Sequence, residues 1–146
     1  MKKIFVTVIL VLSLILSYNT KQCYAKSKLY TNDNIKLLSK IIHHEAGNVR
    51  QKTRKLVGVV VLKRMKSPLF PNTMREVLFQ PRQYMSEYSL MQVTPNKKSI
   101  KTAKNLLKKG YKGIKKYPDN LLFHSNFVQG EIYTVSDGVY FCLHNA

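Results

Sequence analysis

Residues 32–47 read NDNIKLLSKIIHHEAG, a pattern typical of an amphipathic helix. An apolar stripe recurs at helical spacing and is formed by Leu38, Ile41 and Ile42. The next position on this stripe is Glu45, three residues after Ile42 and four after Ile41. We therefore expect a carboxylate on the apolar side of a helix, in its last turn.

The predicted helix has recognisable ends. Asp33 or Thr31 can cap its start, and Gly47 suits the left-handed position just past its end. Partial burial and the negative end of the helix dipole both disfavour ionisation of Glu45. An acid held protonated near neutral pH suits general acid catalysis. The alternative is an ordinary surface glutamate at a frayed helix end.

The first 25 residues have the pattern of an export signal. A charged start, MKK, precedes an apolar run from Ile4 to Leu16, and the small residue Ala25 ends the polar stretch that follows. The apolar run is shorter than the about 20 residues that a membrane-spanning helix needs. We therefore expect residues 1–25 to be a signal peptide, with an uncleaved anchor as the alternative, and residues 26–146 to form one exported domain.

The chain is strongly basic, with 25 Lys and Arg residues against 7 Asp and Glu residues, a formal net charge of +18. Such a charge favours a polyanionic partner, which means nucleic acid, anionic lipid or the anionic polymers of a cell wall. Export argues against nucleic acid, and no nucleic-acid recognition motif is visible. We therefore expect anionic cell-wall polymers as partners, no nucleic acid, and a monomer.

The rest of the chain is predicted to be mainly helical. By periodicity alone, the apolar run with a basic end is either a buried helix or a buried strand; its flanks favour a helix over about 53–66, in which Gly58 indicates close helix packing. A T-x-x-E capping box predicts a short helix from Thr73, limited by Pro81, and a lysine-rich amphipathic stretch predicts a helix capped by Ser99 and ended by Gly110. Residues 82–96 are expected to be irregular.

The C-terminal part changes to strand periodicity. The pair Asp137-Gly138 predicts a tight turn between hairpin arms at 132–135 and 139–143, and residues 121–123 are a third strand candidate. The expected fold class is α+β, mainly helical, with a small C-terminal antiparallel sheet.

Two kinds of catalytic site are disfavoured by the pattern. His43, His44 and Glu45 suggest a zinc protease, but the H-E-x-x-H motif needs a second histidine where this chain has Asn48. Cys142 lies on a predicted hairpin arm, where a small buried hydrophobe is the usual role of a thiol. We therefore expect no metal site and no cofactor.

Carboxylates remain as the candidate catalytic groups. Seven are present: Asp33, Glu45, Glu76, Glu87, Asp119, Glu131 and Asp137. Several suit helix caps or turns, and only Glu45 lies on an apolar stripe. Cleavage of a glycosidic bond usually uses two carboxylates, but one suffices if the sugar supplies the internal nucleophile.

Four blocks of the sequence form a specific combination. They are IIHHEAG at 41–47, VGVVVLKR at 57–64, KSPLFPNT at 66–73 and QPRQY at 80–84. Together they resemble the SleB/CwlJ family of cell-wall hydrolases, and the S-P-x-F-P-N-T block after V-V-L-x-R is the most specific element. The resemblance extends more loosely to the C-terminal part, at 121–126 and 138–141.

The resemblance implies a lysozyme-like catalytic domain that cleaves peptidoglycan, as SleB-like lytic transglycosylases do in spore cortex during germination. It implies that Glu45 protonates the oxygen linking N-acetylmuramic acid to N-acetylglucosamine. The same group would then take the proton of the muramoyl C6 hydroxyl and close a 1,6-anhydro ring. The chain departs from the family at Lys63, where Asn is usual, and at His44, where a small residue is usual.

Further residues are expected to bind the substrate. Gln83 and Tyr84 match a Gln-aromatic pair of the family, while Ser125, Asn126 and Tyr140 would line an opposite wall. Aromatic faces pack on sugar rings, and amides bind hydroxyl and acetamide groups. The alternatives are core packing for the two tyrosines and a loop amide bonded to the backbone for Asn126.

Two other functions stay open from the sequence. One is a hydrolytic muramidase that uses water, with Glu87 as the partner carboxylate. The other is a cationic wall- or membrane-binding protein without catalytic activity. Spore cortex and vegetative wall both fit as targets.

Overall fold

The computed structural model describes residues 29–145, and the predicted signal peptide at 1–25 therefore lies outside the described residues. The elements are α2 (Asn32–Ala46), α3 (Gln51–Lys66), α4 (Met74–Leu78), α5 (Glu87–Gln92), α6 (Lys97–Ile114), β1 (Leu121–Ser125), β2 (Glu131–Ser136) and β3 (Val139–Leu143). Within the described range, no helix has the length and apolar character needed to cross a membrane.

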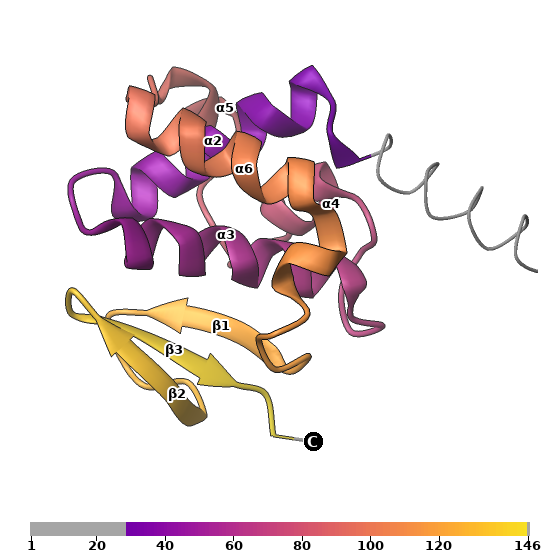
Figure 1. Cartoon of the computed structure of the whole chain (residues 1–146), viewed down its shortest axis with the longest axis vertical. Helices are drawn as coiled ribbons and strands as arrows, with labels where there is room; N and C mark the ends of the chain where they lie inside the picture. Colours follow the sequence, from indigo (N-terminus) through magenta and orange to yellow (C-terminus); the bar gives the residue numbers. More distant parts are fainter. Residues whose placement is uncertain (1–28, 146) are drawn as a thin grey trace, which may run out of the picture.

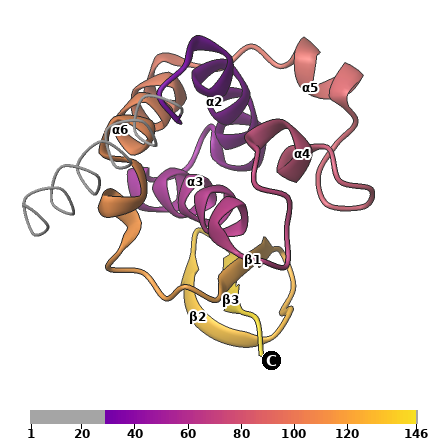
Figure 2. The same cartoon turned by 90° about the vertical axis from the view of Figure 1, so that its right-hand side faces the viewer.

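The helices form one layer and the small sheet forms the other (Figure 1). Helix α3 lies between the remaining helices and the sheet, and strand β1 packs against it. Helix α6 contacts α2 and α3 on one side, whereas α4 and α5 lie on the opposite side (Figure 2). The predicted α+β architecture, mainly helical with a small antiparallel sheet, is confirmed.

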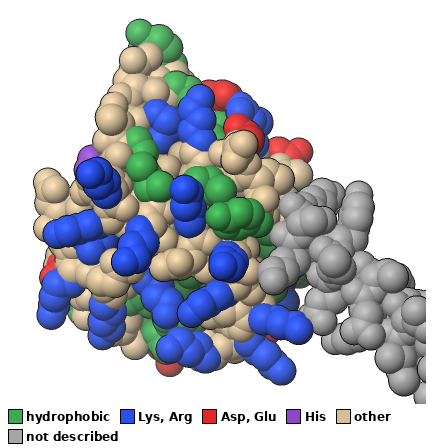
Figure 3. All heavy atoms as spheres, turned by 45° about the horizontal axis from the view of Figure 1, so that its top comes forward, with side chains coloured by type: hydrophobic (Ala, Val, Ile, Leu, Met, Phe, Trp, Pro, Cys, Tyr) green, Lys and Arg blue, Asp and Glu red, His purple; other side chains and the backbone are tan. Residues whose placement is uncertain are grey.

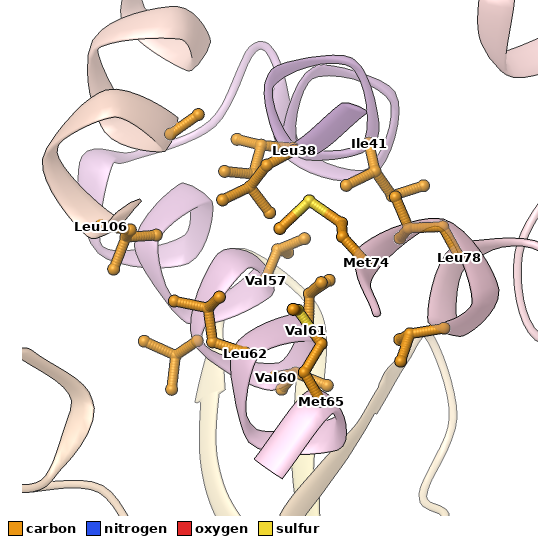
Figure 4. Packing of buried hydrophobic residues seen from close by; sticks show 14 of the residues in the cluster. Leu38, Ile41, Val57, Val60, Val61, Leu62, Met65, Met74, Leu78 and Leu106 are labelled. Carbon is orange, nitrogen blue, oxygen red and sulfur yellow. The ribbon is translucent and has the colours of Figure 1, made fainter. Parts of the chain in front are cut away.

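Side chains of α2 and α6 pack closely against Gly58 of α3. A Cβ atom on Gly58 would lie 2.4 Å from Cδ1 of Leu106 and 3.0 Å from Cδ1 of Ile42. The predicted close packing at this glycine is therefore confirmed. Buried side chains such as Leu38 and Val61 fill the adjoining space between the helices (Figure 4).

The two ends of α2 differ in how well they were predicted. Thr31 caps the start, because its hydroxyl oxygen accepts the backbone N–H of Asn34 at 3.2 Å. At the other end, Gly47 has φ −59° and ψ −37°, so the predicted left-handed conformation is wrong. Glycine is needed there for a different reason: a Cβ atom would lie 2.4 Å from Nδ1 of His43.

Asp137 at the hairpin turn fixes the start of α3. Its carboxylate accepts the backbone N–H of Arg50 at 3.2 Å, the Nε of Arg50 at 2.7 Å and the hydroxyl of Thr53. The hydrogen bond from Thr53, followed by those from Arg50, holds the pKa of Asp137 below its ordinary value. Arg50 is the N-cap residue of α3 and makes no side-chain capping bond of its own. The C-terminal hairpin therefore caps a helix from the other end of the chain.

The prediction that residues 82–96 are irregular is wrong for their central part. Ser86 caps α5 by accepting the backbone N–H of Ser89 at 3.2 Å, and Glu87 occupies the first turn. The helix has six residues and buries only Leu90. Such a short helix shows too little periodicity to be recognised in the sequence.

Helix α6 is longer at both ends than predicted. Its cap is Asn96, whose side-chain oxygen accepts the backbone N–H of Ser99 at 2.8 Å. Gly110 interrupts the helix with φ 57° and ψ −154°, but another helical turn follows to Ile114. The predicted end at Gly110 is therefore a kink.

The sheet has the strand order β1-β3-β2, and both pairings are antiparallel. Asp137 has φ 52° and Gly138 has φ 77°, the positive values that a two-residue hairpin turn requires. The predicted hairpin is confirmed, and each of its arms extends no more than one residue beyond the predicted ends. Cys142 is buried as a free thiol, as expected.

Lys and Arg side chains cover much of the face shown in Figure 3, with few Asp and Glu side chains among them. The exposed lysines of α6 are on its solvent side, as the amphipathic pattern predicted; they include Lys101, Lys104, Lys108 and Lys109. These lysines leave the opposite side of α6 to pack against α2 and α3.

Candidate functional site

Glu45 lies in the last turn of α2, four and three residues after the buried Ile41 and Ile42. Its side chain is 29% exposed. Within residues 29–145 no donor forms a hydrogen bond to its carboxyl group, and Nε2 of His44 lies 3.8 Å from Oε1. The carboxyl group is thus both partly buried and open to a ligand.

The pKa of Glu45 is raised above its ordinary value, chiefly because burial penalises the charged carboxylate. The positive charges of His44 and Arg64 act in the opposite direction and do not cancel the effect of burial. The expected partial burial and raised pKa are therefore confirmed. A carboxyl group of this kind can carry a proton closer to neutral pH than an ordinary glutamate can.

Arg64 of α3 connects the sheet to the aromatic side chains around the site. Its Nε donates to the backbone carbonyl of Leu122 at 2.7 Å. The guanidinium carbon lies 5.0 Å from the ring centroid of Phe70, 5.2 Å from that of Tyr84 and 5.8 Å from that of Phe123. Its Nη1 is buried and has no hydrogen-bond partner among the described residues. Arg64 therefore places a fixed positive charge among three aromatic rings.

Tyr84 and His124 form a polar contact next to this guanidinium. The phenol oxygen of Tyr84 lies 3.3 Å from Nε2 of His124, and the His124 ring also packs near Phe141, with centroids 6.0 Å apart. Burial raises the pKa of Tyr84 to about 12, with Arg64 lowering it and Glu45 raising it further. Burial, and then Arg64, lower the pKa of His124 to about 3. Both side chains are therefore uncharged at neutral pH.

Glu45 and Arg64 both act on the pKa of Tyr84, and Arg64 acts on that of Glu45, so the three groups lie within electrostatic reach of one another. The structure thus brings together Glu45 from α2, Arg64 from α3, Tyr84 from the α4–α5 loop and His124 from β1. Sequence reasoning did not assign Arg64 and His124 to the site. For Arg64, the V-V-L-x-R block was the available signal; for His124, no pattern in the sequence pointed to the site.

Gln83 is an exposed residue of the same loop as Tyr84. Its backbone N–H donates to the carbonyl of Gln80 at 3.2 Å, and the intervening Arg82 has φ 65°. The turn that Arg82 forms sets the direction in which the chain reaches Tyr84. No described hydrogen bond joins the Gln83 side chain to Glu45.

Ser125 ends β1, Asn126 follows it in the chain, and Tyr140 lies in β3. The Ser125 hydroxyl donates to the carbonyl of Phe127 and accepts the backbone N–H of Phe127 at 3.2 Å, so it stabilises the local turn. Asn126 is exposed. Ser125 pairs with Tyr140 across the strands, and neighbouring strand residues alternate in direction, so both point away from the face that carries His124.

Glu87, the candidate partner carboxylate of a muramidase, has a different partner. It lies in the first turn of α5 and forms an ion pair with Nη1 of Arg75. Arg75 also lies 3.7 Å from Asp33. No described contact connects Glu87 with Glu45.

Comparison with known proteins gives the family. The family model described as Cell Wall Hydrolase matches residues 49–140, a range that begins just after Glu45. A spore cortex-lytic enzyme of Bacillus subtilis (strain 168) is 35% identical over 52 residues, which are 36% of this chain and 17% of that protein. The chain therefore aligns with less than a fifth of that relative.

Two solved structures are similar to the described fold. One is the catalytic domain of the Bacillus cereus SleB protein, with a TM-score of 0.63 and 20% identity, covering 77% of this chain and 91% of that one. The other is the catalytic domain of the germination-specific lytic transglycosylase SleB from Bacillus anthracis, with the same TM-score and identity, covering 77% and 96%. The expected lysozyme-like, SleB-type fold is confirmed. Because the family model spans well over half of the chain, this protein belongs to the Cell Wall Hydrolase family.

Proposed function

We propose that this protein is an exported enzyme that cleaves the glycan strands of peptidoglycan, with Glu45 as its catalytic acid and base. The observation that carries the proposal is the partly buried carboxyl group of Glu45, whose pKa is raised, in a chain of the Cell Wall Hydrolase family. The bond cut is the one between N-acetylmuramic acid and N-acetylglucosamine.

The proposed reaction is that of a lytic transglycosylase. Protonated Glu45 gives its proton to the glycosidic oxygen, and the bond from that oxygen to C1 of the muramoyl sugar breaks. The C6 hydroxyl oxygen of the same sugar bonds to C1, and the Glu45 carboxylate takes the hydroxyl proton. One glutamate thus serves twice, no water is consumed, and the product ends in a 1,6-anhydro ring.

The neighbours of Glu45 support such a cycle. The positive charge of Arg64 favours the carboxylate once the proton has left, while partial burial favours the acid before that. Tyr84 keeps its hydroxyl proton at neutral pH, so it can donate a hydrogen bond to a sugar oxygen. In this proposal Tyr84 and Gln83 bind the glycan nearest the reacting bond, whereas Ser125 and Tyr140, which point away from the His124 face, are not assigned to it; Asn126 is exposed and stays a candidate contact.

The basic surface favours the same target. A net charge of +18 attracts anionic wall polymers, and the predicted export signal would bring the protein to them. The proposal therefore includes action outside the cytoplasm, on spore cortex or vegetative wall.

The test is digestion of purified peptidoglycan sacculi by the wild-type protein, Glu45→Gln and Glu87→Gln. We expect the wild-type protein to release soluble fragments with anhydro-muramoyl ends, and Glu45→Gln to reduce release at least about 100-fold. Glu87→Gln should retain activity. Reducing ends, with activity lost in both variants, would replace the proposal by a two-carboxylate muramidase. Release by Glu45→Gln at the wild-type rate would remove Glu45 from the mechanism.

A further inference from the structure

A second surface feature lies next to the end of α2. It is a pocket of about 810 Å³, here called the cationic pocket. It is lined by Gly47, Asn48, Val49, Arg50, Arg54, Asn96, Lys97, Lys98 and Asp137. Nothing in the proposed reaction at Glu45 uses these side chains.

The charges of the cationic pocket are unbalanced. Four cationic side chains line it, from Arg50, Arg54, Lys97 and Lys98, against one carboxylate, that of Asp137. This carboxylate is already occupied by Arg50, whose Nε lies 2.7 Å away, and by the hydroxyl of Thr53. The two lysines have no acidic partner within 4.0 Å among the described residues.

Two long helices begin at the cationic pocket. Arg50 is the N-cap residue of α3, and Lys97 and Lys98 open α6. Neither helix has an acidic residue in its first turn. The start of a helix carries the positive end of its dipole, where cations are unfavourable and anions are stabilised. Asp137 already supplies an anion at the start of α3, whereas no carboxylate of the described residues pairs with the lysines that open α6.

Arg54 supplies an independent observation. The residue is only 6% exposed, and its guanidinium donates to the backbone carbonyl of Val49 and to Oε1 of Gln51, the latter at 3.2 Å. Its Nε has no hydrogen-bond partner in the described part of the chain. No carboxylate among residues 29–145 lies within 4.0 Å of this guanidinium. Arg54 is thus a buried positive charge without a counterion at the wall of the pocket.

We propose that the cationic pocket binds a carboxylate of the peptide stems that peptidoglycan carries on its muramoyl sugars. The inference rests on the proposed function. Gly47 and Asn48 line the pocket and follow Glu45 by two and three residues, so the pocket lies within about 11 Å of chain from the reacting group. The stem hangs from the muramoyl sugar whose bond is cut, so its carboxylates lie on the same strand. The pocket would thereby select glycan that still carries peptide.

The variant that tests this proposal is Lys97→Gln/Lys98→Gln. Both lysines are exposed, and neither side chain makes a described hydrogen bond, so folding should be preserved. The matched control is Lys108→Gln/Lys109→Gln, which removes two exposed charges from the same helix outside the pocket. Both are made in the full chain and compared with the wild-type protein.

The measurement is cosedimentation with sacculi freed of phosphate-bearing polymers. Because an amidase that removes the cross-linking stems dissolves the sacculus, binding of the resulting peptide-free glycan strands is measured by capture on the immobilised proteins. We expect the Lys97/Lys98 variant to bind peptide-bearing sacculi about fivefold more weakly than the control variant. On peptide-free glycan the two variants should bind equally. Added salt should weaken wild-type binding to the peptide-bearing form.

Equal binding by the two double variants to peptide-bearing sacculi would overturn the proposal. Weaker binding of the Lys97/Lys98 variant than of the control variant to peptide-free glycan would also overturn the proposal. A defect seen only when phosphate-bearing polymers are left on the sacculi would assign the pocket to phosphodiesters instead. Binding is measured with Glu45→Gln added to each protein, so that no glycan is cut during the assay. If the protein with Glu45 intact releases no fragments from sacculi, that result contradicts the proposed function and leaves the binding comparison valid.

Discussion

The guanidinium carbon of Arg64 lies 5.2 Å from the centroid of the Tyr84 ring, so a charge from α3 rests on an aromatic side chain of the α4–α5 loop. The same guanidinium is bound to the carbonyl of Leu122 in β1. Arg64 thereby joins a helix, a loop and a strand around Glu45. An ammonium group lacks the planar shape that allows one face to stack on a ring while the edge donates to a carbonyl.

Replacing Arg64 by Lys should accordingly destabilise the protein and lower its activity. We expect Arg64→Lys to lower the free energy of unfolding by about 1–3 kcal/mol, because a buried carbonyl loses its charged donor. Urea denaturation measures this change, and digestion of sacculi measures the accompanying loss of activity. Arg75→Lys is the matched control, since Arg75 is half-exposed and stacks on Phe79 at 5.7 Å. Equal effects of the two substitutions would contradict the special role of Arg64.

The neutral state of His124 predicts a loss of stability in acid. Its pKa in the folded protein is about 3, whereas an unfolded histidine titrates near 6.5, so the unfolded chain binds the proton first. Stability should fall as the pH drops from about 6.5 towards 3, by up to about 1.4 kcal/mol per pH unit. His124→Phe should remove this slope from urea titrations at several pH values, while His144→Gln should keep it. An unchanged slope in His124→Phe would refute the assignment.

Glu45 should show the opposite dependence. Its pKa is raised by burial, so the folded state favours the acid form and stability is lost as the pH rises through the folded pKa. Glu45→Gln should therefore be more stable than the wild-type protein at pH 7, by a fraction of a kcal/mol. This difference should shrink at a pH below about 4, where the wild-type carboxyl group is protonated. Thermal unfolding of both proteins at the two pH values measures this difference in stability. A Glu45→Gln variant less stable than the wild-type protein at pH 7 would contradict the raised pKa of Glu45.

The ion pair between Lys63 and Asp119 predicts that removing one partner destabilises the protein more than replacing both. The Lys63 side chain is 1% exposed, and its Nζ lies 2.6 Å from Oδ1 of Asp119 and 2.7 Å from the carbonyl of Tyr117. Asp119→Asn should cost about 1–2 kcal/mol, because the buried ammonium loses its counterion, although water screens the exposed carboxylate. Lys63→Met/Asp119→Asn should recover part of that loss.

The same pair contributes to acid sensitivity. Hydrogen bonds from Lys63 and Lys66 lower the pKa of Asp119, so its contribution is present above the unfolded pKa of about 3.9 and is lost as the pH falls below it. Urea unfolding of both variants at pH 7 and pH 3 measures this. A double variant less stable than Asp119→Asn would show that Lys63 is held by packing alone.

Gly58 predicts a steric coupling with Leu106. Gly58→Ala places a Cβ 2.4 Å from Cδ1 of Leu106, and we expect a loss of about 1–3 kcal/mol in place of the gain that alanine usually brings to a helix. Leu106→Ala removes the opposing methyl groups. In the double variant, Gly58→Ala should therefore cost less than it does alone. A double-mutant cycle in urea gives the coupling, and strict additivity would contradict the contact.

The sequence was sufficient for the longer elements. The stripe through Ile41 and Ile42 predicted α2 and the partial burial of Glu45, and Asp137-Gly138 predicted the hairpin turn, because each depends on local periodicity or backbone conformation. Short or interrupted elements were missed. Helix α5 has too few residues to show a period, and Gly110 predicts an end of α6 where the structure has a kink.

By itself, then, the sequence determined where the carboxyl group of Glu45 lies and which side of α2 carries it. Only the tertiary structure decided which side chains surround this carboxyl group. The reason is that side-chain periodicity describes one element relative to its own axis and does not say which other elements pack on that face. Tyr84 and His124 are 40 residues apart in the chain and meet only when the sheet packs against α3. The cap that Asp137 gives to α3 and the cationic pocket likewise arise from contacts between distant segments.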